Sequence, residues 1–282
     1  MKICLILDST TYRARYLNNA NIKIVSLHVM TPKGSFRENE IPIDEVKENI
    51  KNNVKMTTSQ ASPGDFIETY KEIEALGFTD ALVVPLSSAI SGTYQSANIA
   101  KNSFEGKLNI HVFKTKICSF AIENITPRIL EIIEEENDIN KVIDKVGFLL
   151  DNSEVGFTLG SLIHLLRGGR LSIVSALLGT VLRIKPIIEM IDGKLVNTKK
   201  PRTYSAVIEY FNQKISYYAQ NYEKVYLNII ELDKREYALK INEFASNYPN
   251  VRTIITNELS PVFFVHLGLD GFGISITGEN KI

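Results

Sequence analysis

The chain has 282 residues, of which 44% are hydrophobic and 23% charged, and its 32 lysines and arginines balance its 32 aspartates and glutamates. This is ordinary for a soluble globular protein with two domains or one large domain, and it leaves room for an internal ligand cavity. Zero net charge excludes a strong electrostatic footprint for nucleic acid or an anionic membrane surface. No apolar run is as long as a membrane span, and residues 1–7 are too short for a signal peptide, so we expect a cytoplasmic protein.

Strands and helices alternate in the first half of the sequence. The best-marked helix covers 62–76, because Ser62, Pro63 and Asp65 suit its first positions and Gly77 suits its end. The other expected elements are strands at 3–7, 24–30, 81–86, 108–113 and 155–159, helices at 43–50 and 91–101, and a polar loop at 56–60. This alternation predicts a Rossmann-like parallel sheet flanked by helices.

The second half predicts hairpins and mixed connections. Asp192-Gly193 lies between two apolar runs and predicts a tight turn, because both residues tolerate positive φ angles. The expected elements are strands at 186–191, 194–198, 225–231, 251–256, 262–266 and 272–277, and helices at 162–167, 172–182, 203–221 and 234–247. We therefore expect an α/β protein of two domains: an α/β domain over 1–155 and an α+β domain over 156–282.

Cysteine usage argues against a metal site. Cys4 and Cys118 are isolated in apolar surroundings, without the spacing of metal ligands. Two isolated cysteines also fit a reducing compartment.

Two hydroxyl-rich loops follow predicted strands, at residues 57–60 (Thr-Thr-Ser-Gln) and 87–94 (Ser-Ser-Ala-Ile-Ser-Gly-Thr-Tyr). In an open parallel sheet, loops at the carboxyl ends of the strands line the ligand crevice. The second loop enters a helix, where the free amides of Gly92 and Thr93 and the helix dipole favour a carboxylate or phosphate. The alternative is that these hydroxyls only cap helices and close turns.

Four further features each allow two interpretations. Residues 8–10 (Asp-Ser-Thr) either orient the other hydroxyls or form an Asx-turn. His266, at the end of a predicted strand, either serves a site or is a structural group. The arginines of residues 167–170 (Arg-Gly-Gly-Arg) either hold a phosphate or a partner's carboxylate, or are solvated charges at a helix end. Apolar residues 171–191 are either core or the lining of an acyl tunnel.

These motifs resemble those of the DegV family, whose members are lipid-binding proteins that carry fatty acids for bacterial fatty acid kinase. The resemblance covers nearly the whole chain. The matching stretches are residues 8–10, 58–63 (TSQASP), 87–97 (SSAISGTYQSA), 168–172 (GGRLS), 176–179, 184–186 and 192–194. Together, SGTYQSA and GGRLS on one chain are highly specific.

The resemblance implies the EDD fold, in which two α/β domains bury an acyl chain between them, with a fatty acid as ligand and no other cofactor. Thr58 and Ser91 would hold the carboxylate, with His266 assisting and Gly92 and Thr93 nearby.

Other residues would act around this site. Asp8, Ser9 and Ser59 would support it, while Arg170 and Arg202 are candidate contacts for a kinase subunit.

Two segments depart from the family pattern. The usual His-Thr-Gly-Pro-Gly is His-Leu-Gly-Leu-Asp at 266–270, and residues 114–121 lack the usual Asp-Ser and glycines. Lipid binding depends on these segments less than presentation to a kinase does.

Two other functions remain open at this point. A serine hydrolase would use Ser91 as nucleophile, His266 as base, and Asp8 or Asp270 to orient it. However, Ser-Gly-Thr-Tyr is not a G-x-S-x-G elbow. The other possibility is a binding module for a different amphipathic carboxylate or a phospholipid. The chain has neither a GxxxxGK[ST] loop nor a kinase signature set, so we expect a binding protein and not an enzyme.

Overall fold

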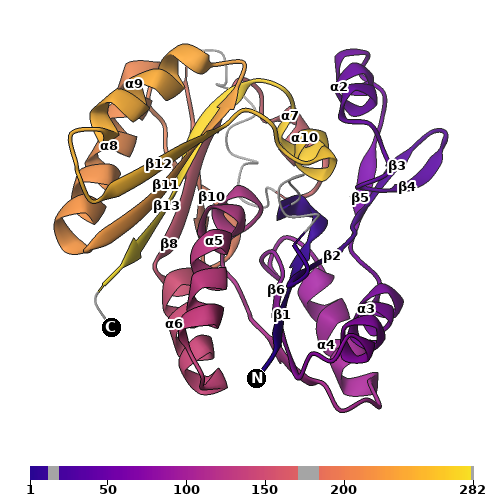
Figure 1. Ribbon diagram of the computed structural model, residues 1–282. Coiled ribbons are helices and arrows are strands. Elements are labelled where there is room, and N and C mark those ends of the chain that lie inside the picture. The colour runs from indigo at the N-terminus through magenta and orange to yellow at the C-terminus, as the bar shows by residue number, and fades with distance from the viewer. Residues whose placement is uncertain (12–18, 171–183, 281–282) are drawn as a thin grey trace.

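The structure of the protein is a computed structural model, and it describes residues 1–11, 19–170 and 184–280. Within these ranges the strands form three sheets, and helices cover the two larger ones (Figure 1). The predicted helix at 172–182 and most of the possible tunnel lining at 171–191 lie outside the described residues.

The N-terminal sheet has four parallel strands in the order β2-β1-β6-β7. They are β1 (Ile3–Asp8), β2 (Ile22–Val25), β6 (Asp80–Val84) and β7 (Asn109–Val112). All residues of β1 and β6 are buried, as expected for parallel strands covered on both faces. The prediction of a parallel sheet is therefore confirmed.

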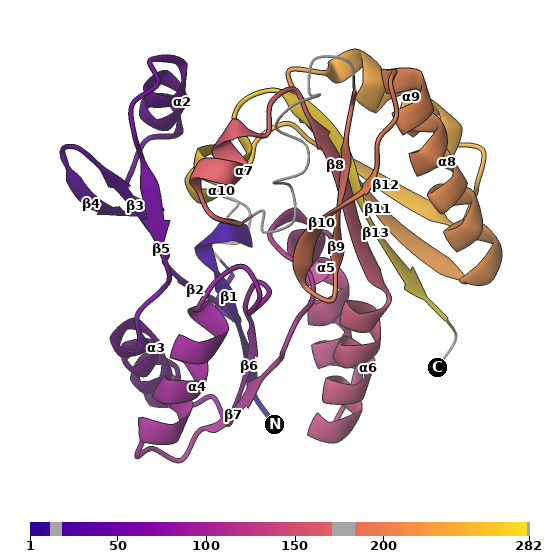
Figure 2. The same cartoon turned by 180° about the vertical axis from the view of Figure 1, so that it is seen from behind.

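Two helices pack together on one side of this sheet, α3 (Pro63–Ala75) and α4 (Thr93–Ser103) (Figure 2). The start of α3 is as predicted, because the Ser62 hydroxyl accepts a hydrogen bond from the Asp65 amide and the Asp65 carboxylate accepts one from the Ser62 amide. After α3, Gly77 adopts a φ of 80°, which favours glycine.

A small antiparallel sheet has the order β4-β3-β5 and corrects two expectations. Its strands are β3 (His28–Thr31), β4 (Gly34–Arg37) and β5 (Thr57–Ser59), and α2 (Ile43–Lys51) precedes β5. The single strand expected at 24–30 is wrong, because the chain leaves the parallel sheet at Ser26 and enters this one. The loop expected at 56–60 contains a strand, because Thr58 pairs with Val29 of β3. Threonine is common in strands as well as in turns, so the presence of a partner strand decides whether this segment forms a strand or a loop.

The C-terminal sheet is mixed and has the order β10-β9-β8-β13-β11-β12, in which only β11 and β12 pair in parallel. The strands are β8 (Ser153–Leu159), β9 (Ile187–Ile191), β10 (Lys194–Lys199), β11 (Lys224–Leu232), β12 (Val251–Thr256) and β13 (Gly271–Glu279). This confirms the predicted hairpin at Asp192-Gly193 and the α+β character of the second half.

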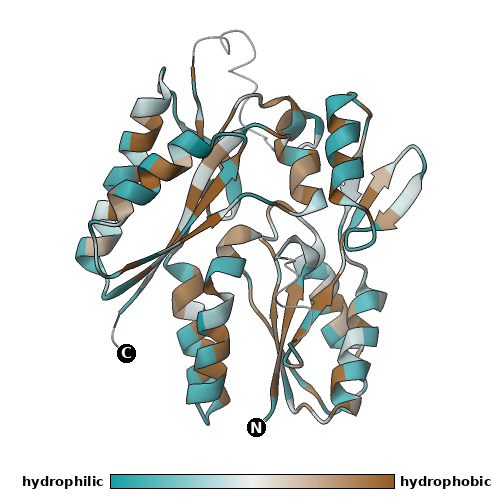
Figure 3. Cartoon of the chain, turned by 45° about the horizontal axis from the view of Figure 1, so that its top comes forward, coloured by the Kyte–Doolittle hydropathy of each residue, from teal (hydrophilic) through white to brown (hydrophobic). Residues whose placement is uncertain are grey.

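Helices cover both faces of the mixed sheet. One face carries α8 (Tyr204–Asn221) and α9 (Arg235–Ala245), and the other carries α5 (Phe120–Glu135) and α6 (Ile139–Asp151) (Figures 1 and 2). Helices α5 and α6 were not predicted from the sequence. Figure 3 shows apolar residues gathered on the strands and on the sheet-facing sides of the helices. One large core runs through both halves, so a division at residues 155/156 stays a prediction.

The predicted strand at 262–266 is wrong, because this segment is helix α10 (Pro261–Leu267). The Ser260 hydroxyl accepts from the Phe263 amide and Pro261 takes the first helical position, so the helix has a regular start. A short run of buried apolar residues has no period that separates helix from strand. Helix α10 packs against α2, β5 and α7 (Ile163–Arg167), and it brings His266 toward the N-terminal half.

Candidate functional site

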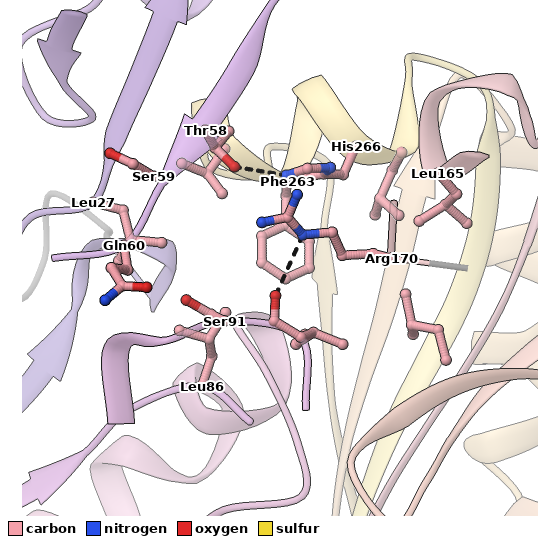
Figure 4. Close-up of a pocket in the computed structure, with 14 residues that line it drawn as sticks. Leu27, Thr58, Ser59, Gln60, Leu86, Ser91, Leu165, Arg170, Phe263 and His266 are labelled. Carbon is pink, nitrogen blue, oxygen red and sulfur yellow. Dashed lines mark hydrogen bonds between the residues drawn. The ribbon is translucent and has the colours of Figure 1, made fainter. Parts of the chain in front are cut away.

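One cavity unites the segments that the sequence motifs single out (Figure 4). We call it the hydroxyl pocket. Its lining consists of Leu27, Thr58, Ser59, Gln60, Leu86, Ile90, Ser91, Leu165, Arg170, Leu195, Val262, Phe263, His266 and Leu267. It encloses about 50 Å³, room for a few water-sized groups. Most of its wall is apolar, and its hydroxyls come from β5 and from the turn before α4.

Thr58 and His266 are 208 residues apart in the sequence, and Thr58 Oγ1 lies 2.8 Å from His266 Nε2. Burial lowers the pKa of His266 to about 4, and the positive charge of Arg170 adds to this effect. The ring is therefore uncharged at neutral pH. Its other nitrogen, Nδ1, is enclosed and has no hydrogen-bond partner among the described residues.

Ser91 lines the pocket, and Thr93 lies behind it at the start of α4. Ser91 Oγ is 2.9 Å from Thr93 Oγ1 and also accepts a hydrogen bond of 3.3 Å from the Thr93 amide. Thr93 is fully buried, so it acts on Ser91 and not on the cavity directly.

Gly92 leaves space for the side chain of Gln60. A Cβ atom at position 92 would lie 1.9 Å from Gln60 Oε1. Gln60 also donates a hydrogen bond of 3.0 Å to the Ser96 hydroxyl. These contacts connect the end of β5 with the first turn of α4, so the two hydroxyl loops form one unit.

Asp8 and Ser9 shape the pocket from behind. Asp8 is buried, accepts from the Thr10 amide at 3.0 Å in an Asx-turn, and accepts from the Leu86 amide at 2.6 Å. Burial raises the pKa of Asp8. Ser9 accepts a hydrogen bond of 2.8 Å from the Leu27 amide. Leu86 and Leu27 both line the pocket, so this network positions the apolar wall and does not touch its hydroxyls.

Glu38 is 2% exposed and was not predicted from the sequence as part of the site. It accepts a hydrogen bond from the Ser9 hydroxyl and one of 2.8 Å from the Val262 amide at the start of α10. Burial raises the pKa of Glu38 to about 7. The bond to Val262 spans 224 residues, and no local pattern in the sequence marks it.

The two candidate partner contacts lie in different places. Arg170 lines the pocket, and its Nη1 donates to the Gly168 carbonyl at 2.5 Å. Arg202 is exposed in the turn between β10 and α8, away from the pocket lining.

The arrangement lacks the contacts of a Ser-His-Asp triad. Ser91 Oγ bonds to Thr93 and His266 Nε2 to Thr58, so nucleophile and base do not meet. Neither carboxylate proposed to orient the base contacts His266: Asp8 bonds to backbone amides and Asp270 forms an ion pair with Lys234. The serine hydrolase alternative is not supported.

Two kinds of feature are absent from the described residues. No group of three or more histidine, cysteine, aspartate or glutamate side chains in these ranges is placed to hold a metal ion. No helix in the described part of the chain combines the length and the apolar character needed to cross a membrane.

Comparisons with known proteins agree over the whole chain. The sequence profile described as "uncharacterised protein, DegV family" matches residues 2–279. A DegV domain-containing protein of Staphylococcus aureus strain COL is 31% identical, over 99% of this chain and 98% of that protein.

Two solved structures share the fold. A DegV family protein from Thermus thermophilus, described by its fatty acid binding, has 27% identity, a TM-score of 0.87 and coverage of 99% of this chain and 100% of that chain. DegV from Bacillus subtilis, described as a fatty acid binding protein, has 26% identity, a TM-score of 0.87 and the same coverage. The motifs, the fold and these comparisons agree: the chain belongs to the DegV family.

Proposed function

We propose that the protein binds a long-chain fatty acid, with its carboxylate between Thr58 and Ser91. The observation that carries this proposal is the hydroxyl pocket, in which hydroxyls from two loops and a neutral histidine meet inside an apolar wall. The two family members described as fatty acid binding proteins support the same ligand class.

Ser91 is prepared to donate to a carboxylate. Its oxygen accepts from the Thr93 amide and can also accept from the Thr93 hydroxyl. If Thr93 donates, the proton of Ser91 is free to point into the pocket. Hydrogen bonds to a charged acceptor are worth about 1.5–3 kcal/mol each, and they offset the desolvation of a buried carboxylate. The guanidinium of Arg170, on the same wall, adds favourable charge.

The acyl tail would lie against the apolar wall. Leu27, Leu86, Leu165, Leu195 and Phe263 supply it. Each methylene removed from water contributes about 0.8 kcal/mol, so the tail would dominate the affinity. A cavity of about 50 Å³ fits only the carboxylate end, so binding of the whole molecule requires the apolar wall to open further.

The bound acid would be presented to a separate kinase subunit. The chain has no phosphate-binding GxxxxGK[ST] loop, so the nucleotide would be held by the partner, in the cytoplasm. Arg170 and Arg202 are the proposed contacts. Co-purification with the kinase subunit from the same cells tests this, and Arg202→Gln should weaken the complex and leave the lipid content unchanged.

The ligand itself can be identified directly. We expect mass spectrometry of the denatured protein to recover a fatty acid, or the delipidated protein to take up added palmitate or oleate. Ser91→Ala should weaken fatty acid binding by about 10-fold or more, because one bond to a charged group is lost. Ser103→Ala, at an exposed position at the end of α4, is the matched control. Recovery of no fatty acid together with no uptake would disprove the proposal.

A further inference from the structure

A second cavity, larger than the hydroxyl pocket, lies between α2, β5, α7 and α10. It encloses about 500 Å³, within the range of roughly 300–1,000 Å³ typical of small-molecule sites. None of its lining residues belongs to the proposed carboxylate site. We call it the basic cavity.

The lining of the basic cavity carries positive charge. Lys55 and Arg167 line it with His164, and no acidic residue is among the described lining residues. Neither Lys55 nor Arg167 forms an ion pair within the described part of the chain, although each is exposed. The charge of Arg167 in the last turn of α7 also stabilises that helix end. Lys55 lies outside any helix, so helix stabilisation does not explain why both Lys55 and Arg167 line the cavity.

Uncharged hydrogen-bonding groups also line the basic cavity. Asn53 and Thr57, each two residues from Lys55 along the chain, supply an amide and a hydroxyl. The pKa of His164 is lowered by burial and by the charge of Arg167, so its ring is a neutral donor or acceptor at pH 7. A phosphate group has three terminal oxygens, which accept hydrogen bonds from many directions. Two cations and several neutral donors therefore suit a phosphate better than a planar carboxylate.

Apolar side chains also line the basic cavity. Ile50, Val54, Met56 and Val265 line it. A cavity of this size and lining has more room than a bare phosphate ion fills, and apolar side chains contribute nothing to holding one. They favour a ligand that joins its anionic group to an organic part.

The basic cavity and the hydroxyl pocket share a thin wall. Thr57 faces the first and Thr58 the second, because successive residues of a strand point to opposite sides. On α10, Val265 lines the basic cavity and the next residue, His266, lines the hydroxyl pocket. Gly168 completes the wall, and a Cβ atom there would lie 2.3 Å from Nδ1 of His266. The two cavities are thus neighbours with separate linings.

We propose that the basic cavity is a second ligand site, which binds an organic phosphate: the phosphate on Lys55 and Arg167, and the organic part against the apolar lining residues. This goes beyond the proposed fatty acid function and does not require it. The phosphate can come from a soluble phosphate ester or from the head group of a lipid.

Methionine methyl signals in nuclear magnetic resonance can report on this site. The chain has four methionines, and Met56 is the one that lines the basic cavity. Phenyl phosphate, added to the full-length ¹³C-methyl-methionine protein, should shift the Met56 signal saturably and leave Met190, buried in β9, unmoved. Inorganic phosphate should compete more weakly.

Arg167→Gln should weaken binding of phenyl phosphate about 10-fold, since a charge-assisted contact is lost. Lys51→Gln, on an exposed lysine at the end of α2 outside the cavity, is the matched control.

Further titrations separate the sources and the alternatives. Tighter binding of dihexanoyl phosphatidate than of phenyl phosphate would identify a lipid head group as the source, and the reverse order a soluble phosphate ester. Either order supports the site. A Met56 signal that no phosphate shifts, or a shift that Arg167→Gln leaves unchanged, would overturn it. A fatty acid that shifts Met56 and displaces phenyl phosphate would also overturn it. Fatty acid recovery by mass spectrometry is measured separately, so failure here is distinct from failure of the proposed function.

Discussion

At the residue scale, the bond between Thr58 and His266 has a direction that decides what the pocket can bind. If Thr58 donates to Nε2, its hydroxyl has no proton left for a ligand. If Nε2 carries the proton, Thr58 accepts from the histidine and donates to a carboxylate. The proposed bond from Thr58 to a fatty acid carboxylate therefore requires the tautomer with its proton on Nε2. In that tautomer the enclosed Nδ1 is an acceptor, and in the proposed site His266 would act by orienting Thr58.

The role of the Thr58 hydroxyl is testable with two substitutions of different chemistry. Thr58→Val keeps the shape of the side chain and removes the donor, so fatty acid affinity should fall about 10- to 100-fold. Thr58→Ser keeps the hydroxyl and should stay within about 3-fold of the wild type. Displacement of a fluorescent fatty acid measures both. Equal losses in the two variants would contradict a hydrogen bond from Thr58.

At the element scale, the sequence predicted most of the fold where local signals are strong. The alternating elements of the first half, the hairpin at Asp192-Gly193 and the capped start of α3 at Ser62 are examples. Apart from the two long helices α5 and α6, which were not predicted, the failures involve short segments whose state depends on distant partners. Strand β5 exists because Thr58 pairs with β3, and α10 is apolar all round because it is buried between the two halves.

In the candidate site, too, the residues with a local sequence signal were predicted and the residue without one was not. Thr58, Ser91 and His266 stand in motifs, and the structure brings all three to one cavity. Glu38 could not be found, because its partner Val262 is 224 residues away and one buried glutamate has no periodic or local signature.

Gly92 leaves room for Gln60, which connects β5 with α4, and its effect can be compared with that of a glycine without such a contact. Gly92→Ala should displace Gln60 and leave buried Ser96 without its partner, which lowers the free energy of unfolding by about 1–3 kcal/mol. A Cβ atom at Gly147, inside α6, would meet nothing within 4 Å, so Gly147→Ala should raise stability by up to about 1 kcal/mol. Urea unfolding measures both. Stabilisation by both alanines would show that the Gly92–Gln60 contact is unimportant.

At the scale of the whole molecule, one buried carboxylate, that of Glu38, connects the end of the parallel sheet to α10. Glu38 receives hydrogen bonds from Ser9 after β1 and from Val262 of α10, and Asp8 lies close enough to raise the Glu38 pKa slightly further. Stability should therefore depend on the charge of Glu38. His266 has the opposite shift, since its folded pKa of about 4 lies below its ordinary 6.5.

Glu38→Gln isolates the contribution of Glu38 to pH dependence. The folded pKa of about 7 exceeds the ordinary 4.5, so between these values the folded state binds more protons than the unfolded state, and stability falls as pH rises. The limiting slope is about 1.4 kcal/mol per pH unit.

Glutamine resembles the neutral carboxyl, so the Glu38→Gln variant should lose this decline in stability. The rise in stability that His266 contributes between about pH 4 and 6.5 would then show more clearly. We therefore expect the stability of the variant, relative to the wild type, to increase from pH 4.5 to 7 and level off above it. Urea unfolding across this range provides the measurement, with the raised pKa of Asp8 common to both proteins. A stability difference that is constant with pH would mean that Glu38 titrates normally in the folded protein and that its burial carries no electrostatic cost.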